Sequence, residues 1–113
     1  MKEAYVSYET AKLLKEKGFN EKVFTYYEDE VLKDDFWFEW NRSPFGHIAA
    51  PTHQMACAWV REKGYHVYTF KGVDYWVFEI QSLNEDWTYS LGVFKEHDDA
   101  MEAALKYSLE NLI

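Results

Sequence analysis

The sequence lacks a second cysteine, since Cys57 is the single one among 113 residues. An internal disulfide is therefore excluded, and the cysteine usage fits a reducing cytosol. Basic residues are also scarce: 12 Lys and Arg stand against 20 Asp and Glu, for a formal net charge of −8. Binding to nucleic-acid phosphates or to an anionic membrane needs clustered positive charge, so we expect neither partner.

Long apolar runs are missing as well. The opening MKEAYVSYE contains no apolar stretch of signal-peptide length, and no later segment approaches a membrane span of about 20 apolar residues. We therefore expect a cytoplasmic protein. Repeats, low-complexity segments and linkers are absent too, so the length predicts a single domain over residues 1–113.

Aromatic residues are abundant, at 19% of the chain. Most of them lie in short runs that are typical of strands. We predict strands at residues 22–27, 36–40, 65–70 and 75–81, and a further one that starts at 87 and ends between 91 and 94. The acidic segment 28–35 indicates a hairpin or an exposed loop, and residues 41–50 a loop. Short turns between consecutive strands predict antiparallel pairing.

Three helices are expected. Ser7 can cap the first, and Gly18 can end it. Pro51 and Gly64 bracket a central helix with Trp59 in the middle of its apolar stripe, and a last helix starts at His97. The order of elements predicts an α+β two-layer domain, an antiparallel sheet of about four to five strands with helices packed mainly on one face.

The central helix also carries a resemblance. Ala50-Pro51-Thr52, Gln54, Ala56 and Trp59-Val60-Arg61 resemble the APT-x-Q-x-A-x-x-W-(Leu/Val)-R signature of a family of small uncharacterised bacteroidete proteins. Members are often encoded in phage or mobile-element neighbourhoods. The resemblance implies a mobile-element origin and no particular activity. Family members usually have apolar residues where this chain has His53 and Cys57.

His53 and Cys57 lie four residues apart, so their side chains share one flank of the helix. That spacing suits two metal ligands, or a nucleophile with its base. The other histidines lack motif spacing, however, and a cysteine at the border of a core behaves as a small apolar group. We therefore favour the core-border interpretation and predict no metal and no cofactor.

The aromatic set is the feature that a core explains least. Trp37, Tyr75 and Trp87 fall on strand positions expected to face away from the helices, and exposed aromatic patches mark partner surfaces. Asp34 and Asp35 add an acidic cluster beside Trp37; the acidic run lacks the order of a calcium loop. These five residues form the predicted interaction surface, with a symmetric homodimer as the expected assembly.

Two alternatives stay open beside this interpretation. The −8 charge suits an acidic decoy that blocks a nucleic-acid-binding protein. Aromatic residues could instead enclose a small-molecule pocket, with polar groups from Arg42 and from the candidate set His53, Gln54, Cys57, His66 and Tyr68. We predict a non-enzymatic interaction or regulatory accessory protein, and a small enzyme that uses His53 and Cys57 is the remaining hypothesis.

Overall fold

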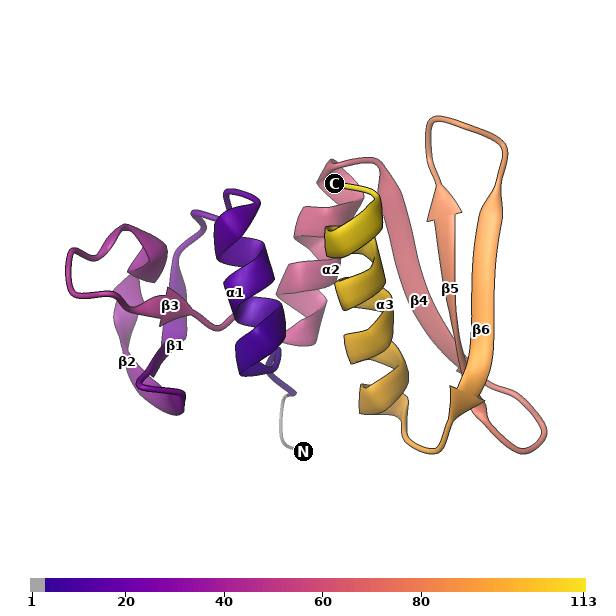
Figure 1. Ribbon diagram of the computed structural model, residues 1–113, viewed down its shortest axis with the longest axis horizontal. Helices are drawn as coiled ribbons and strands as arrows, with labels where there is room; N and C mark the ends of the chain where they lie inside the picture. The colour runs from indigo at the N-terminus through magenta and orange to yellow at the C-terminus, as the bar shows by residue number, and fades with distance from the viewer. Residues whose placement is uncertain (1–3) are drawn as a thin grey trace. The chain divides into compact units, whose positions relative to one another are not determined.

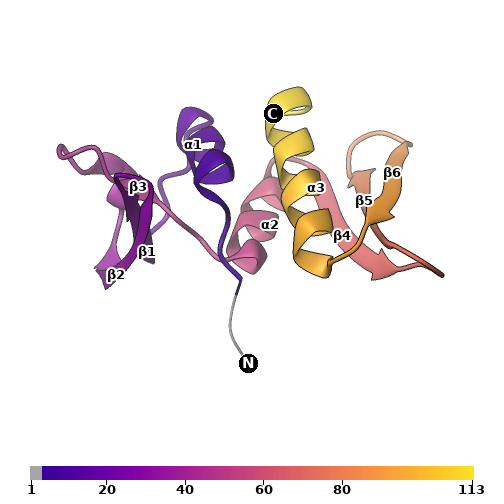
Figure 2. The same cartoon turned by 60° about the horizontal axis from the view of Figure 1, so that its bottom comes forward.

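The computed structural model describes residues 4–113. The chain divides into two compact units, Met1–Thr52 and His53–Ile113, each with its own three-stranded antiparallel sheet. Figures 1 and 2 show the elements of each unit from two directions.

The first unit begins with helix α1, Tyr8–Glu16. The Ser7 hydroxyl accepts a hydrogen bond from the Thr10 backbone N–H, which satisfies one of the free donors of the first turn. Gly18, at a φ of +94°, adopts the left-handed conformation that ends the helix. The predicted first helix is thus confirmed at both ends.

Three strands follow α1: β1, Val23–Glu28; β2, Val31–Phe38; and β3, Ile48–Ala49. Their order in the sheet is β2-β1-β3. A short 3₁₀ helix, Trp40–Arg42, follows β2. Trp40 is buried, stacks on Tyr26 at a ring distance of 4.1 Å, and donates its indole N–H to the Val23 carbonyl. This contact fixes the end of β2 against β1.

A two-residue turn connects β1 to β2, so the acidic segment is the hairpin that the sequence allowed. Glu28 pairs with Val31, and Asp29 and Glu30 between them have φ values of +52° and +64°. Positive φ at both central positions is the geometry of a type I′ turn, which matches the twist of a two-stranded hairpin.

The second unit contains α2, His53–Glu62; β4, Tyr65–Lys71; β5, Trp76–Ser82; β6, Thr88–Phe94; and α3, His97–Asn111. The sheet order is β4-β5-β6, and α2 and α3 pack together on one side of it (Figure 1). The core between helices and sheet contains Val67, Phe78, Ile80, Ala104, Leu105 and Leu109. No helix in residues 4–113 is long and apolar enough to cross a membrane.

The predicted α+β class with antiparallel strands is confirmed, but the predicted single sheet of four to five strands is wrong. Two three-stranded sheets form instead, and Ile48–Ala49, expected to be loop, pairs with β1 at Tyr26 and Tyr27. Strand propensity is local, whereas the choice of pairing partner is not, so the sequence pattern did not separate the two sheets. The interpretation of residues 1–113 as one domain stays a prediction.

Candidate functional site

We use the name β2 surface for the eight exposed residues of β2 together with Phe24 of β1. The Trp37 ring contacts Phe24, whereas the rings of Phe36 and Phe38 contact Trp40. Every residue of Val31–Phe38 is exposed. Its apolar members, Val31, Leu32, Phe36, Trp37 and Phe38, keep 37–57% of their area in contact with solvent. The Phe24 ring lies 4.7 Å from that of Trp37, so the two aromatics form one patch.

The β2 surface also lies at the edge of a sheet. Among the residues that the structure describes, β2 pairs only with β1. The pairing is regular from Val31 to Asp34 and becomes irregular between Asp34 and Phe38, because three residues of β2 face Phe24 alone. Bulges of this kind interrupt pairing and redirect side chains, and they are frequent at sheet edges and near sites. The outer edge therefore presents unpaired backbone groups next to exposed aromatic rings.

The charges near this edge fall into two groups. Lys33 donates to the Glu28 carboxylate at 2.7 Å, and the His47 ring lies 2.8 Å from the same carboxylate. The hydrogen bond from Lys33, and then that with His47, lower the pKa of Glu28. Asp34 and Asp35, by contrast, form no ion pair with any residue of 4–113. The strand thus keeps two uncompensated negative charges.

The predicted aromatic surface is only partly assembled. Trp37 lies in β2, whereas Tyr75 directly precedes β5 and Trp87 directly precedes β6 in the other sheet. The assumption that the three share one sheet face is therefore wrong, because it required all strands to join one sheet. Asp34 and Asp35 do lie beside Trp37, as expected.

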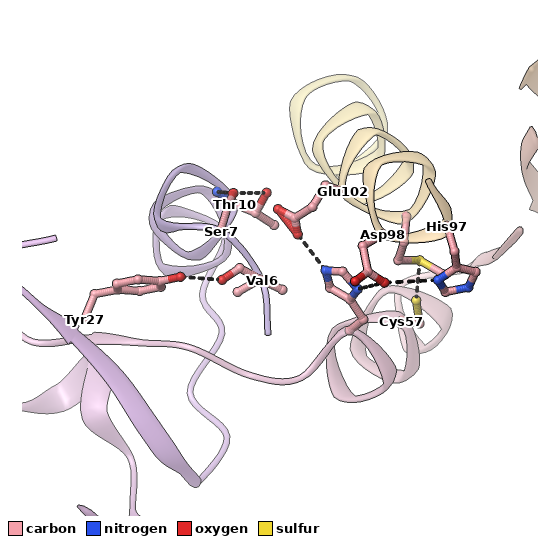
Figure 3. A network of polar contacts seen from close by, with 10 residues as sticks. Val6, Ser7, Thr10, Tyr27, Cys57, His97, Asp98 and Glu102 are labelled. Atoms are coloured by element: carbon pink, nitrogen blue, oxygen red, sulfur yellow. Dashed lines mark hydrogen bonds and ion pairs between the residues drawn. The ribbon is translucent and has the colours of Figure 1, made fainter. Parts of the chain in front are cut away.

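A second polar cluster lies between α2 and α3. The His53 side chain is 10% exposed, its Nε2 lies 2.9 Å from Glu102 Oε2, and its Nδ1 lies 4.0 Å from Asp98 Oδ1. Among residues 4–113, Nδ1 finds no hydrogen-bond partner. Asp98 also contacts His97 Nδ1 at 3.1 Å (Figure 3). His53 thus anchors the start of α2 against α3 through carboxylates.

Cys57 does not belong to this polar cluster. Its Sγ donates to Met101 Sδ at 3.3 Å (Figure 3), and burial raises the pKa of the thiol to about 11. A nucleophilic cysteine needs a lowered pKa and a nearby base. Residues 4–113 hold no group of three side chains arranged to bind a metal. The buried positions of His53 and Cys57 confirm the core-border interpretation.

The candidate pocket set does not converge. Val67 pairs with Ile80 and both are buried on the helix side, so Tyr68, which pairs with Glu79, faces the opposite side of the sheet. His66 and Tyr68 contact each other there at a ring distance of 5.2 Å. A hydrogen bond with Glu79 raises the pKa of Tyr68.

The remaining pocket candidates lie elsewhere. Gln54 is exposed on α2. Arg42 belongs to the first unit, where its guanidinium lies 3.7 Å from the Glu39 carboxylate.

One concavity was not predicted from the sequence. An open groove of about 310 Å³ lies between α3 and the strands β5 and β6. Its lining includes Tyr89 and Tyr107, whose rings stack at 4.6 Å with an interplanar angle of 17°. The other lining residues are Phe78, Leu91, Ala103, Lys106 and Glu110. One feature of the sequence could have indicated this groove: Tyr107 follows the buried Ala104 by three residues on the same helix.

Comparison with known proteins adds no relative: no family model, no curated protein and no solved structure matches the chain. The resemblance to the bacteroidete family stays a prediction.

Proposed function

We propose that this chain is a non-enzymatic protein-interaction module, and that its contact surface is the β2 surface. The observation that carries the proposal is an edge strand of eight residues that are all exposed, five of them large and apolar. Sheet edges of this kind bind extended segments of other proteins by strand addition, in which backbone hydrogen bonds give affinity and side chains give specificity.

The energetics support an interaction role. Covering a large apolar side chain completely is worth about 1.5–3 kcal/mol, and each apolar residue of β2 is already partly covered. Five such residues on one edge strand allow a single extended partner to cover several of them at once. A long exposed edge without a partner would promote aggregation, and Asp34 and Asp35 oppose that outcome.

The same two carboxylates favour a foreign partner over a second copy of the chain. A homodimer was the expectation from the sequence, but it relied on a shared face of Trp37, Tyr75 and Trp87 that the structure does not contain. Antiparallel pairing of two β2 strands about Asp34 and Asp35 would bring like charges together, which is destabilising. We therefore propose a foreign protein as the partner. A regulatory role in a mobile element rests on the resemblance alone.

An acidic decoy is the second candidate function, because Asp34 and Asp35 are exposed and lack ion-pair partners within residues 4–113. The two functions differ in their response to salt. Binding through aromatic burial and strand pairing should persist as salt rises, whereas binding by a charge decoy should weaken steeply.

Selection from a displayed library of random twelve-residue peptides tests the proposal. We expect enriched peptides whose affinity falls about tenfold or more in the Trp37→Ser variant. Tyr75→Ser is the matched control, because Tyr75 is 49% exposed and Trp37 48%. The control should bind as the parent does. Failure to enrich any peptide, or binding that Tyr75→Ser abolishes and Trp37→Ser leaves intact, would contradict the proposal.

Sedimentation velocity separates the two kinds of partner. We expect the parent to remain monomeric at tens of micromolar. A dimer that Trp37→Ser dissociates would assign the β2 surface to a second copy of the chain and overturn the choice of a foreign protein.

A further inference from the structure

The β2 strand has a block pattern along its length. Two aliphatic residues, Val31 and Leu32, precede Lys33 and the acidic pair, and the aromatic residues 36–38 follow them. An added strand contacts its neighbour residue by residue, so its own sequence must complement this order.

We infer, on the basis of the proposed function, that the partner is an extended protein segment with two adjacent basic residues between two apolar stretches. The basic pair lies opposite Asp34 and Asp35. The apolar stretches lie opposite the aliphatic and aromatic blocks of β2.

The first step of the argument is that the acidic pair is not neutralised within the described part of the chain. Lys33 is the nearest cation in sequence, but its ammonium group lies 2.7 Å from Glu28. Tyr26 pairs with Lys33 and Thr25 with Asp34, so the neighbouring strand offers Asp34 a hydroxyl residue and no charge. A partner must therefore supply the positive charge.

The second step concerns spacing. Asp34 is the last residue of β2 in regular register with β1 and Asp35 is the next residue, and both side chains are exposed to a partner. One basic side chain can compensate only one of them. Two adjacent basic residues in the added strand supply one positive charge for each carboxylate.

The third step excludes nucleic acid and a second copy of the chain as the partner. Nucleic acid supplies phosphates, which the −8 charge of the chain repels. A second β2 strand paired about its centre places Asp where the pattern needs Lys or Arg. A basic peptide segment satisfies the charges, the backbone edge and the aromatic rings together.

A charge-swap experiment tests the inference with two synthetic peptides. Each has ten residues and consists of alternating valine and threonine around a central pair, which is Lys-Lys in one peptide and Glu-Glu in the other. They are titrated by fluorescence anisotropy against the full chain and against its Asp34→Lys, Asp35→Lys variant. We expect the parent to prefer the lysine peptide by about tenfold and the variant to prefer the glutamate peptide.

The matched control is Glu85→Lys, Asp86→Lys, which changes the net charge equally at an exposed acidic pair in the other unit. The control should keep the preference of the parent, and a reversal there would show that net charge alone acts. Equal binding of both peptides to parent and variant would overturn the inference and leave the proposed function standing, provided that Trp37→Ser weakens both.

Absence of binding by either peptide would also overturn the inference. The result of the library selection then tests the proposed function by itself. Peptides that need Trp37 but carry no basic pair leave the function standing, whereas a library with no binders removes both.

Discussion

Replacing Trp59 by alanine removes the largest side chain from the buried face of α2. Trp59 is only 6% exposed, and the Lys63 ammonium lies 4.8 Å from the centre of its ring. Truncating a buried aromatic to alanine costs about 3–5 kcal/mol, and loss of the cation–π contact adds about 0.5–1 kcal/mol. Small domains unfold with about 5–15 kcal/mol, so the variant should lose a large share of its stability.

Urea denaturation followed by far-ultraviolet circular dichroism measures this loss without relying on tryptophan fluorescence. In a thermal melt followed by the same signal, the midpoint of unfolding should fall by more than about 10 °C. Gln54→Ala is the control, because Gln54 is exposed on the same helix and its truncation should change stability by less than about 0.5 kcal/mol. A loss below about 1 kcal/mol for Trp59→Ala would refute the assignment of Trp59 to the core.

Three further predictions concern single positions. Burial raises the pKa of the Cys57 thiol from 9.0 to about 11, so the contribution of this thiol to stability should be constant well below pH 9 and should be lost as the pH rises from 9 toward 11. Iodoacetamide at pH 8 should modify Cys57 only after denaturant is added, and rapid labelling of the folded protein would contradict the burial. Glu30→Gly should stabilise the hairpin by about 0.5–1 kcal/mol in urea melts, because Glu30 has a φ of +64°; a loss of stability would show that the turn is not strained. Gly92→Ala should destabilise the protein by about 1–3 kcal/mol, since its new Cβ would lie 2.7 Å from Val77 Cγ2. Val77→Ala in the same chain should restore most of that loss in a thermal melt. If the losses of the two single variants simply add in the double variant, the steric cause is excluded.

Local signals predicted most of the elements, although the strand expected at residues 36–40 spans Val31–Phe38. The Ser7 cap and Gly18 gave the ends of α1, and the acidic segment formed the hairpin that its charge pattern allowed. These features depend on residues close in sequence, where capping and turn preferences act. The strand Ile48–Ala49 was not predicted, because a segment of two residues is too short to show the alternation of apolar and polar side chains that marks a strand.

The candidate site was predicted in part for the same reason. Asp34, Asp35 and Trp37 are neighbours in sequence and remain neighbours in β2. Tyr75 and Trp87 were joined to them on the assumption of one sheet, and strand pairing placed them in another. His66 and Tyr68 lie on the face of β4 that points away from the helices, whereas His53 lies on α2. This placement follows from the pairing of Val67 with Ile80 on the helix side.

Hydrogen–deuterium exchange on the full chain tests the central claim most directly. The probe is a peptide enriched in the library selection, added at saturating concentration. We predict that amide exchange slows in residues 31–38, because an added strand bonds to the backbone edge of β2, and that β4, β5 and β6 stay unchanged. Protection confined to residues 65–94, with none in β2, would contradict the account.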